Sequence, residues 1–314
     1  MSELLKILVT CPPMLGMIES FRPIFDRHGI EVTAPNVVQT LSVAELLDLV
    51  PQHDGWIIGD APATHEVYTA GRSGRLKAAV KWGIGVDNVD FIACKDLDIP
   101  ITNTPNMFGA EVADIAMGYL IALARETFHI DAGVRQGKWP KPRGISLSGK
   151  TVALVGYGDI GRNAAKRMLA ADMKVIAYDP FSKDAPDLPS VGRAIWPERI
   201  SEADFILVTS SLTDSSRHMV NAAVFDQAKR GVRVVNVGRG PVIDEPALEA
   251  ALKSGKVYSA ALDVFETEPL PAESYLRSHP RCIFGSHNAS NTVDAVQRTS
   301  AIAIDKLMGF LGGE

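Results

Sequence analysis

The residues of this chain best suited to chemistry are an arginine, a glutamate and a histidine in its second half. Arg239 stands between two glycines, and Glu268 and His287 follow further along the chain, each just past an expected strand. A guanidinium can hold a carboxylate and polarise a carbonyl oxygen. A histidine gives or takes a proton near neutral pH, and a carboxylate partner orients its ring. The three residue types therefore suit acid–base chemistry at a carbonyl carbon beside a carboxylate.

Glu266 competes with Glu268 as the partner of His287, because both follow the same expected strand. The ordinary role of a loop carboxylate is to be solvated, and a single histidine usually serves the structure. The sequence alone leaves open which glutamate meets the imidazole.

A glycine-rich loop supplies a second element of chemistry. Gly156, Gly158 and Gly161 form a GxGxxG pattern, with Asp159 and Ile160 between the last two glycines. The loop directly follows a strand-like run and opens a helical stretch. The glycines permit a tight turn, close approach of a pyrophosphate to the backbone, and close packing of helix on strand. This context predicts a dinucleotide site.

Asp179 ends the next expected strand, where an acidic residue accepts hydrogen bonds from the adenosine ribose hydroxyls. A carboxylate there repels a 2′-phosphate, which favours NAD over NADP. A nicotinamide cofactor together with Arg239 and His287 predicts hydride transfer at the C2 carbon of a small 2-hydroxy or 2-oxo acid.

Secondary-structure elements must position these residues. Along the whole sequence, short apolar runs alternate with helical patterns. That alternation predicts an α/β chain with parallel sheets. A capping box at residues 42–45 starts a helix, and the stretch 135–144, rich in Pro, Gly and charge, predicts an extended arm. Expected strands cover residues 6–10, 30–33, 56–59, 76–80, 151–155, 174–178, 205–209, 232–237, 258–262 and 282–284, and expected helices 109–124, 162–171 and 292–308.

Composition supports this class. The 314 residues are enough for two domains, 46% of them are hydrophobic and 22% charged. The net charge of −5 gives no reason to expect nucleic acid or an anionic membrane as a partner.

Three cysteines show neither a CxxC pair nor a metal-ligand spacing. With no leader-like or membrane-spanning pattern, we expect a cytoplasmic protein.

Several motifs in a fixed order give the chain a specific resemblance to the D-isomer-specific 2-hydroxyacid dehydrogenases, over nearly its full length. They stand at residues 83–90 (GIGVDNVD), 103–105 (NTP), 111–114 (EVAD), 147–151 (LSGKT), 236–240 (NVGRG), 262–265 (LDVF) and 268–269 (EP).

The resemblance implies two doubly wound domains with the active site in the cleft between them. The substrate-binding domain, flavodoxin-like, would comprise residues 1–103 plus 289–314, and a Rossmann NAD-binding domain residues 104–288. It implies Arg239, Glu268 and His287 as the catalytic trio, and Asp263 near the nicotinamide carboxamide. The backbone N–H groups of Ile84 and Gly85 would meet the substrate carboxylate.

The resemblance further implies that Thr209 and Val237 face the cofactor. Lys81, beside the substrate loop, would favour a phosphorylated or bulky acid, although a solvated strand-end lysine is an equal alternative. Family members are typically homodimers, and the arm around Trp139 fits a dimerisation segment.

The sequence departs from the family pattern in three places. Ser286 replaces the usual proline before the histidine, and Asn288 begins a run where glycines are common. The segment 209–213 lacks the frequent histidine and proline of the cofactor-facing loop. The segment 59–62 (GDAP) lacks the arginine that phosphoglycerate dehydrogenases often carry.

The substrate stays open at this point. Candidates are 3-phosphoglycerate, glycerate or hydroxypyruvate, glyoxylate and D-lactate-type acids. A different class is an NAD-sensing corepressor, which is similar to this family, keeps the trio and presents a groove to peptides. Turnover of NADH with 2-oxo acids separates the two.

Overall fold

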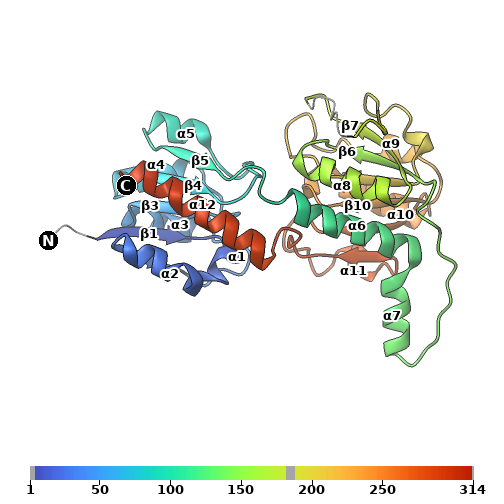
Figure 1. Cartoon of the computed structure of the whole chain (residues 1–314), viewed down its shortest axis with the longest axis horizontal. Coiled ribbons are helices and arrows are strands. Elements are labelled where there is room, and N and C mark those ends of the chain that lie inside the picture. The colour runs from blue at the N-terminus through green and yellow to red at the C-terminus, as the bar shows by residue number, and fades with distance from the viewer. Residues whose placement is uncertain (1–3, 182–187, 313–314) are drawn as a thin grey trace. The chain divides into compact units, whose positions relative to one another are not determined.

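The computed structural model of the protein describes residues 4–181 and 188–312. The chain forms two compact units. Unit 1 comprises Met1–Met107 and Asn291–Glu314, and unit 2 comprises Phe108–Ser290. Each has its own parallel sheet with helices on its faces (Figure 1), as the alternation of patterns predicts.

Unit 1 is built on a five-stranded sheet in the order β2-β1-β3-β4-β5. Every pair of neighbouring strands is parallel. The strands are β1 (Leu5–Val9), β2 (Ile30–Thr33), β3 (Gly55–Ile58), β4 (Ala78–Lys81) and β5 (Ile101–Asn103). Its helices are α1 (Pro12–Leu15), α2 (Ile18–Arg27), α3 (Val43–Leu49), α4 (His65–Ser73), α5 (Phe91–Asp96) and α12 (Val293–Leu311), with a 3₁₀ turn at Val50–Gln52.

The last helix of the chain, α12, packs on the sheet of unit 1 beside β3 and β4. Its buried side chains include Ser300 and Leu307. The indole Nε1 of Trp82 donates to Ser300 Oγ at 3.0 Å. A Cβ at Gly55 would lie 2.6 Å from Ile7 Cδ1 and 3.0 Å from Leu307 Cδ2, so Leu307 packs closely on β3 at this glycine. The opposite face carries α3, α4 and α5 over Trp56 and Ile58.

Unit 2 is built on a seven-stranded parallel sheet in the order β12-β11-β10-β9-β6-β7-β8. The strand order reverses beside β6, which is where ligands gather in open α/β sheets. The strands are β6 (Thr151–Val155), β7 (Lys174–Tyr178), β8 (Val191–Arg193), β9 (Phe205–Val208), β10 (Val232–Asn236), β11 (Val257–Leu262) and β12 (Cys282–Phe284).

Helices cover both faces of this second sheet. Helices α6 and α8 pack together over β6, β10 and β11, and α9 and α10 cover the other face. The helices are α6 (Gly109–Arg125), α7 (Thr127–Arg135), α8 (Asp159–Ala170), α9 (Ala222–Gln227), α10 (Glu245–Lys253) and α11 (Tyr275–Ser278), with 3₁₀ turns at Ile200–Glu202 and Gly240–Val242.

Most expected elements are present within a residue or two, and the capping box at Ser42 and Glu45 forms as predicted. Strand β8 and helix α7 are among the elements that were not predicted. Strand β8 is short and only partly buried. Helix α7 has no buried residue, and its large apolar side chains Phe128 and Val134 are exposed. In Figure 1, α7 and the segment after it stand away from the body of unit 2.

Across residues 4–181 and 188–312, no helix combines the length and the apolar character needed to cross a bilayer.

Candidate active site

Three neighbouring strands of unit 2 carry the predicted trio at their carboxyl ends. Arg239 follows β10, Glu268 follows β11 and His287 follows β12. These strands are adjacent and parallel, so their carboxyl ends share one edge of the sheet. Side chains that lie far apart in sequence are thereby brought to the same edge.

The imidazole of His287 pairs with Glu268. His287 Nδ1 lies 2.8 Å from Glu268 Oε2, and both side chains are about three-quarters buried, at 24% and 22% exposure. The other carboxylate oxygen of Glu268 accepts the backbone N–H of Phe265 at 3.0 Å. The Phe265 N–H therefore fixes the Glu268 carboxylate, and the carboxylate orients the imidazole ring. Because Nδ1 is engaged, Nε2 is the nitrogen that can exchange a proton with a substrate.

The backbone of His287 is held in an uncommon conformation. Its φ is +54°, in the left-handed region that few non-glycine residues adopt. The N–H of His287 donates to the carbonyl of Asp263 at 2.7 Å. The Asp263 carboxylate accepts the N–H groups of Asn288 at 3.2 Å and Ala289 at 3.0 Å. The left-handed turn is thus imposed by three hydrogen bonds to one residue.

Burial raises the pKa of Asp263, and its hydrogen bonds from Ala289 and Asn288 partly oppose that rise. Its exposure is 3%. Burial also raises the pKa of the nearby Tyr119 to about 12, with a contribution from Asp263. A Cβ at Gly285 would overlap Asp263 Oδ1, so glycine is required there. The Asp263 carboxylate, which we expected near the nicotinamide carboxamide, here holds the histidine loop.

Arg239 is positioned by a residue that sequence reasoning missed. Asn236, buried at the end of β10, donates through Nδ2 to the carbonyl of Arg239 at 3.0 Å and accepts the N–H of Gly238 at 3.0 Å. A Cβ at Gly238 would lie 2.6 Å from Ser210 O, and one at Gly240 would overlap the backbone of Phe265. The flanking glycines therefore let the arginine loop pack between its neighbours.

Glu266, the competing carboxylate, faces elsewhere. Its Oε1 lies 2.8 Å from His218 Nε2 and accepts the N–H of Glu245 at 3.1 Å. The sequence left open which of Glu266 and Glu268 meets His287. In the structure, the turn after β11 directs Glu268 toward His287 and Glu266 toward His218.

The glycine loop has the geometry that a dinucleotide pyrophosphate needs. Gly156 has φ +95°, and a Cβ on it would lie 2.6 Å from Ser210 N. A Cβ at Gly161 would overlap Gly156 O, whereas one at Gly158 would meet nothing within 4 Å. Gly158 thus faces open space at the start of α8, whose cap has no side-chain hydrogen bond. The N–H groups of the first turn remain available to a phosphate.

The residues around this loop hold it in place. Thr209 Oγ1 donates to Gly156 O at 2.8 Å, and the N–H of Val237 donates to Val208 O at 3.1 Å. Asp179 stands at the end of β7, and its Oδ2 accepts the N–H of Tyr157 at 2.7 Å. A carboxylate therefore lies beside the glycine loop, where a ribose is expected.

Asp159 was predicted to contact the cofactor. Its carboxylate instead bonds Asn163 at 3.1 Å and lies against Gly109 at the start of α6, where a Cβ would overlap it. That helix end favours negative charge. Asp159 and Ile160 contribute to the loop through the backbone at the start of α8.

Unit 1 holds the residues expected to meet the substrate carboxylate. Ile84 and Gly85 follow β4 and are partly exposed, and Gly83 before them has φ +114°. Among the described residues, the backbone N–H groups of Ile84 and Gly85 have no acceptor. Two successive unpaired donors suit an anion.

Lys81, which we expect beside the substrate loop, is buried and has its hydrogen-bond partners within unit 1. Its exposure is 3%, and Nζ donates to Gly59 O at 2.7 Å and Trp82 O at 3.2 Å and lies 3.3 Å from Asp60 Oδ1. The ammonium is engaged inside unit 1, because a buried charge needs partners. It is therefore not a solvated lysine.

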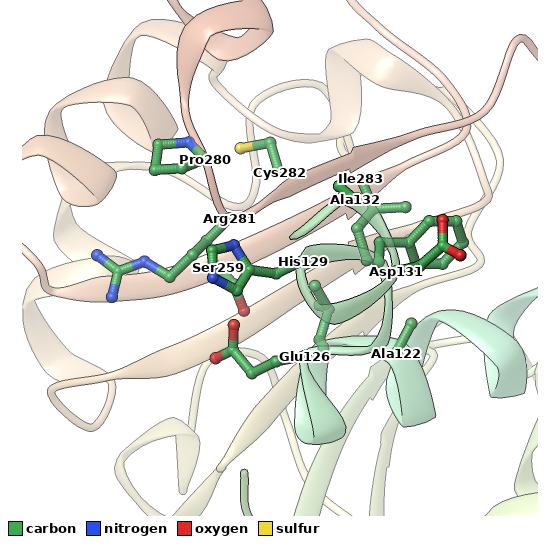
Figure 2. A pocket seen from close by; sticks show the side chains of 12 residues that line it. Ala122, Glu126, His129, Asp131, Ala132, Ser259, Pro280, Arg281, Cys282 and Ile283 are labelled. Carbon is green, nitrogen blue, oxygen red and sulfur yellow. The ribbon is translucent and has the colours of Figure 1, made fainter. Parts of the chain in front are cut away.

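A hollow of about 350 Å³ lies elsewhere in unit 2, against α6, α7, β11 and β12 (Figure 2). Glu126, His129, Ser259 and Arg281 line it. Ser259 is 2% exposed, and its Oγ has no hydrogen-bond partner among the described residues. None of the predicted site residues lines this hollow.

The family model described as "D-isomer specific 2-hydroxyacid dehydrogenase, NAD binding domain" matches residues 117–289. The chain is 37% identical over 300 residues to a hydroxypyruvate reductase from Thermotoga maritima, covering 94% of this chain and 95% of that one. It is 36% identical over 278 residues to D-3-phosphoglycerate dehydrogenase 3, chloroplastic, from Arabidopsis thaliana, covering 87% of this chain.

The chain spans only 47% of that plant protein's length. Among solved structures, the apo form of D-lactate dehydrogenase from Escherichia coli matches with a TM-score of 0.84 and 25% identity. That match covers 99% of this chain and 98% of the other.

Proposed function

Since the chain belongs to the D-isomer specific 2-hydroxyacid dehydrogenases, which are NAD-dependent oxidoreductases, we propose that Arg239, Glu268 and His287 carry out its reaction on a short 2-oxo acid. The observation that carries this proposal is the His287–Glu268 pair, with 2.8 Å between Nδ1 and Oε2, on the sheet edge that also carries Arg239. Bound NAD supplies or accepts the hydride.

The residues of the chain do the remaining work. Arg239 holds the substrate and polarises the C2 carbonyl, where a guanidinium stabilises developing negative charge. His287, oriented by Glu268, donates a proton from Nε2 to the C2 oxygen during reduction and recovers it in oxidation. The N–H groups of Ile84 and Gly85 bind the substrate carboxylate.

Hydroxypyruvate is the first substrate to test, because the match to the Thermotoga reductase covers nearly the whole of both chains. The other candidates are glyoxylate, 3-phosphohydroxypyruvate, pyruvate and branched 2-oxo acids. Oxidation of NADH with each acid, with the product's configuration determined, tests the proposal. We expect D-2-hydroxy acids. Binding of NADH without turnover of any acid would favour the corepressor alternative.

We also propose that the protein is a homodimer built on α7 and the arm after it. Helix α7 buries no residue of its own. Phe128 is 57% exposed, Val134 44% and Trp139 77%. Of these three residues, Phe128 also lines the hollow that contains Ser259, which Figure 2 shows from close by. A projection and a hollow on one face of one chain are complementary across a twofold axis.

Light scattering of the purified protein tests the dimer. We expect twice the chain mass, and a Phe128→Glu/Trp139→Glu variant should shift toward the monomer. Ile92→Glu is a matched control, because Ile92 is 75% exposed on α5 in unit 1. A monomeric wild type, or an unchanged mass in the double variant, would refute this interface.

A further inference from the structure

Unit 1 contains a buried ammonium whose partners are all in two adjoining loops. Lys81 Nζ donates to the carbonyls of Gly59 and Trp82 and pairs with the carboxylate of Asp60. Two carbonyls and one carboxylate satisfy its three protons. A charge buried to 3% exposure is stable only with such partners. The ammonium therefore fixes where Asp60 stands.

Asp60 stands beside the loop expected to bind the substrate carboxylate. It follows β3, and the loop follows β4, the neighbouring parallel strand in which Lys81 lies opposite Ile58. Asn88 joins the two loops, because its Nδ2 donates to Gly59 O at 3.0 Å and Ala61 O at 2.7 Å. Unlike Lys81, the Asp60 side chain is 42% exposed.

The loop around Asp60 carries no cation. Residues 59–62 read Gly-Asp-Ala-Pro. No larger side chain fits at the first position, since a Cβ on Gly59 would lie 2.7 Å from Cys11 Cα and 2.8 Å from Thr10 O. The solvent-facing charge of this loop is therefore the carboxylate, while the compensating ammonium lies behind it.

We propose that Asp60, fixed by Lys81, selects the group that the substrate carries at C3. It accepts a hydrogen bond from a hydroxyl there and repels a phosphate. This inference rests on the proposed function, because it needs Ile84 and Gly85 to bind the substrate carboxylate. In a three-carbon acid the C3 substituent then lies close to the same loop.

The physical basis is a repulsive element that discriminates between otherwise similar acids. A phosphate brings about two negative charges toward a fixed carboxylate, and like charges brought together cost affinity. A hydroxyl instead donates to it, and a hydrogen bond to a charged group is stronger than a neutral one. Asp60 is a specificity residue and Lys81 a positioning residue.

The test compares hydroxypyruvate with 3-phosphohydroxypyruvate in NADH-dependent reduction. We expect the wild type to prefer hydroxypyruvate in kcat/KM. Asp60→Asn keeps an acceptor for Lys81 and removes the charge. It should raise kcat/KM for the phosphorylated acid relative to hydroxypyruvate by roughly tenfold or more. Glu66→Gln, an exposed charge change on α4 of the same unit, is the control and should leave the ratio unchanged.

A second measurement needs no variant. Salt screens exposed charges, so added salt should raise the wild-type rate with 3-phosphohydroxypyruvate relative to hydroxypyruvate. A wild-type preference for the phosphorylated acid, or an Asp60→Asn ratio equal to that of the wild type, would overturn the inference while leaving the dehydrogenase assignment intact. Failure of the wild type to reduce any 2-oxo acid would instead overturn the proposed function.

Discussion

Glu268 reaches His287 through one carboxylate oxygen and the backbone of Phe265 through the other. This two-sided attachment fixes both the carboxylate and the imidazole. Glu268→Gln should keep the fold but lose the charge that stabilises the protonated imidazole. We expect kcat to fall roughly 10²–10⁴-fold, the usual contribution of a positioned acid–base group.

Glu266→Gln is the control for that variant, because Glu266 follows the same strand but faces His218 and α10. Steady-state kinetics of both variants separate these roles. Glu268→Gln should lower kcat for 2-oxo acid reduction, and Glu266→Gln should retain the wild-type kcat. Equal losses in the two variants would show that the His287–Glu268 pair has no special role.

Arg239→Ala should raise KM and lower kcat together, because ground-state anchoring and carbonyl polarisation are both lost. Two hydrogen bonds to charged groups, worth about 1.5–3 kcal/mol each, correspond to a loss in kcat/KM of roughly 10²–10⁴-fold. Arg230→Ala, an exposed arginine of the same unit, should leave both parameters near wild type. Wild-type kinetics in Arg239→Ala would remove this residue from the site.

The glycine loop offers a pair of substitutions with opposite consequences. A side chain at Gly158 meets no protein atom within 4 Å, so Gly158→Val should preserve Tm and raise the Kd for NADH at least about tenfold, a loss of ~1.4 kcal/mol or more. Gly161→Ala should lower stability by about 1–3 kcal/mol, because its Cβ overlaps Gly156 O.

Fluorescence titration with NADH and thermal melting together distinguish these effects. If Gly158→Val binds NADH as well as the wild type, the pyrophosphate does not approach this glycine.

Stability should fall as the medium is acidified below about pH 6.5, the ordinary pKa of histidine. Burial lowers the pKa of His53, while the Leu49 carbonyl raises it less and Lys6, Glu31 and Asp54 contribute smaller effects. The unfolded chain therefore binds a proton more readily than the folded one. The neutral His53 side chain makes its full contribution to the free energy of unfolding above pH 6.5. That contribution is lost as the pH falls toward the folded-state pKa of His53.

Melting temperatures of the wild type and His53→Gln between pH 5 and 8 check this. The variant should show a smaller loss on acidification. Parallel curves for the two proteins would mean that His53 does not titrate in this range. Burial also lowers the pKa of His279. We therefore expect His279 to contribute to the loss of melting temperature on acidification that remains in His53→Gln.

Much of the fold was predictable because buried parallel strands read as continuous apolar runs. Strands such as β6 and β7 begin and end at the expected residues, and both are almost wholly buried. Helix α7 escaped prediction because its apolar side chains have no core to face within this chain. Periodic apolar residues predict an element because they are usually buried in a core. A helix that buries none of its residues is therefore hard to recognise in the sequence.

The trio was recognisable from residue type and position after a strand, but its supports were not. Asn236 acts through a loop backbone two and three residues away, and Gly285 matters because Asp263 occupies the space its side chain would need. The Lys81–Asp60 pair depends on strand register across 21 residues. Such relationships are set by tertiary packing, which no spacing in the sequence encodes.

The place of α12 in unit 1 has a consequence for how the protein is made. Translation delivers unit 2 in full by residue 290, whereas unit 1 still lacks the helix that covers β3 and β4. Domains commonly fold in the order of their synthesis. Here β3 and β4 lack that cover until residues 293–311 have been made, so of these two units the one begun first is the one completed last.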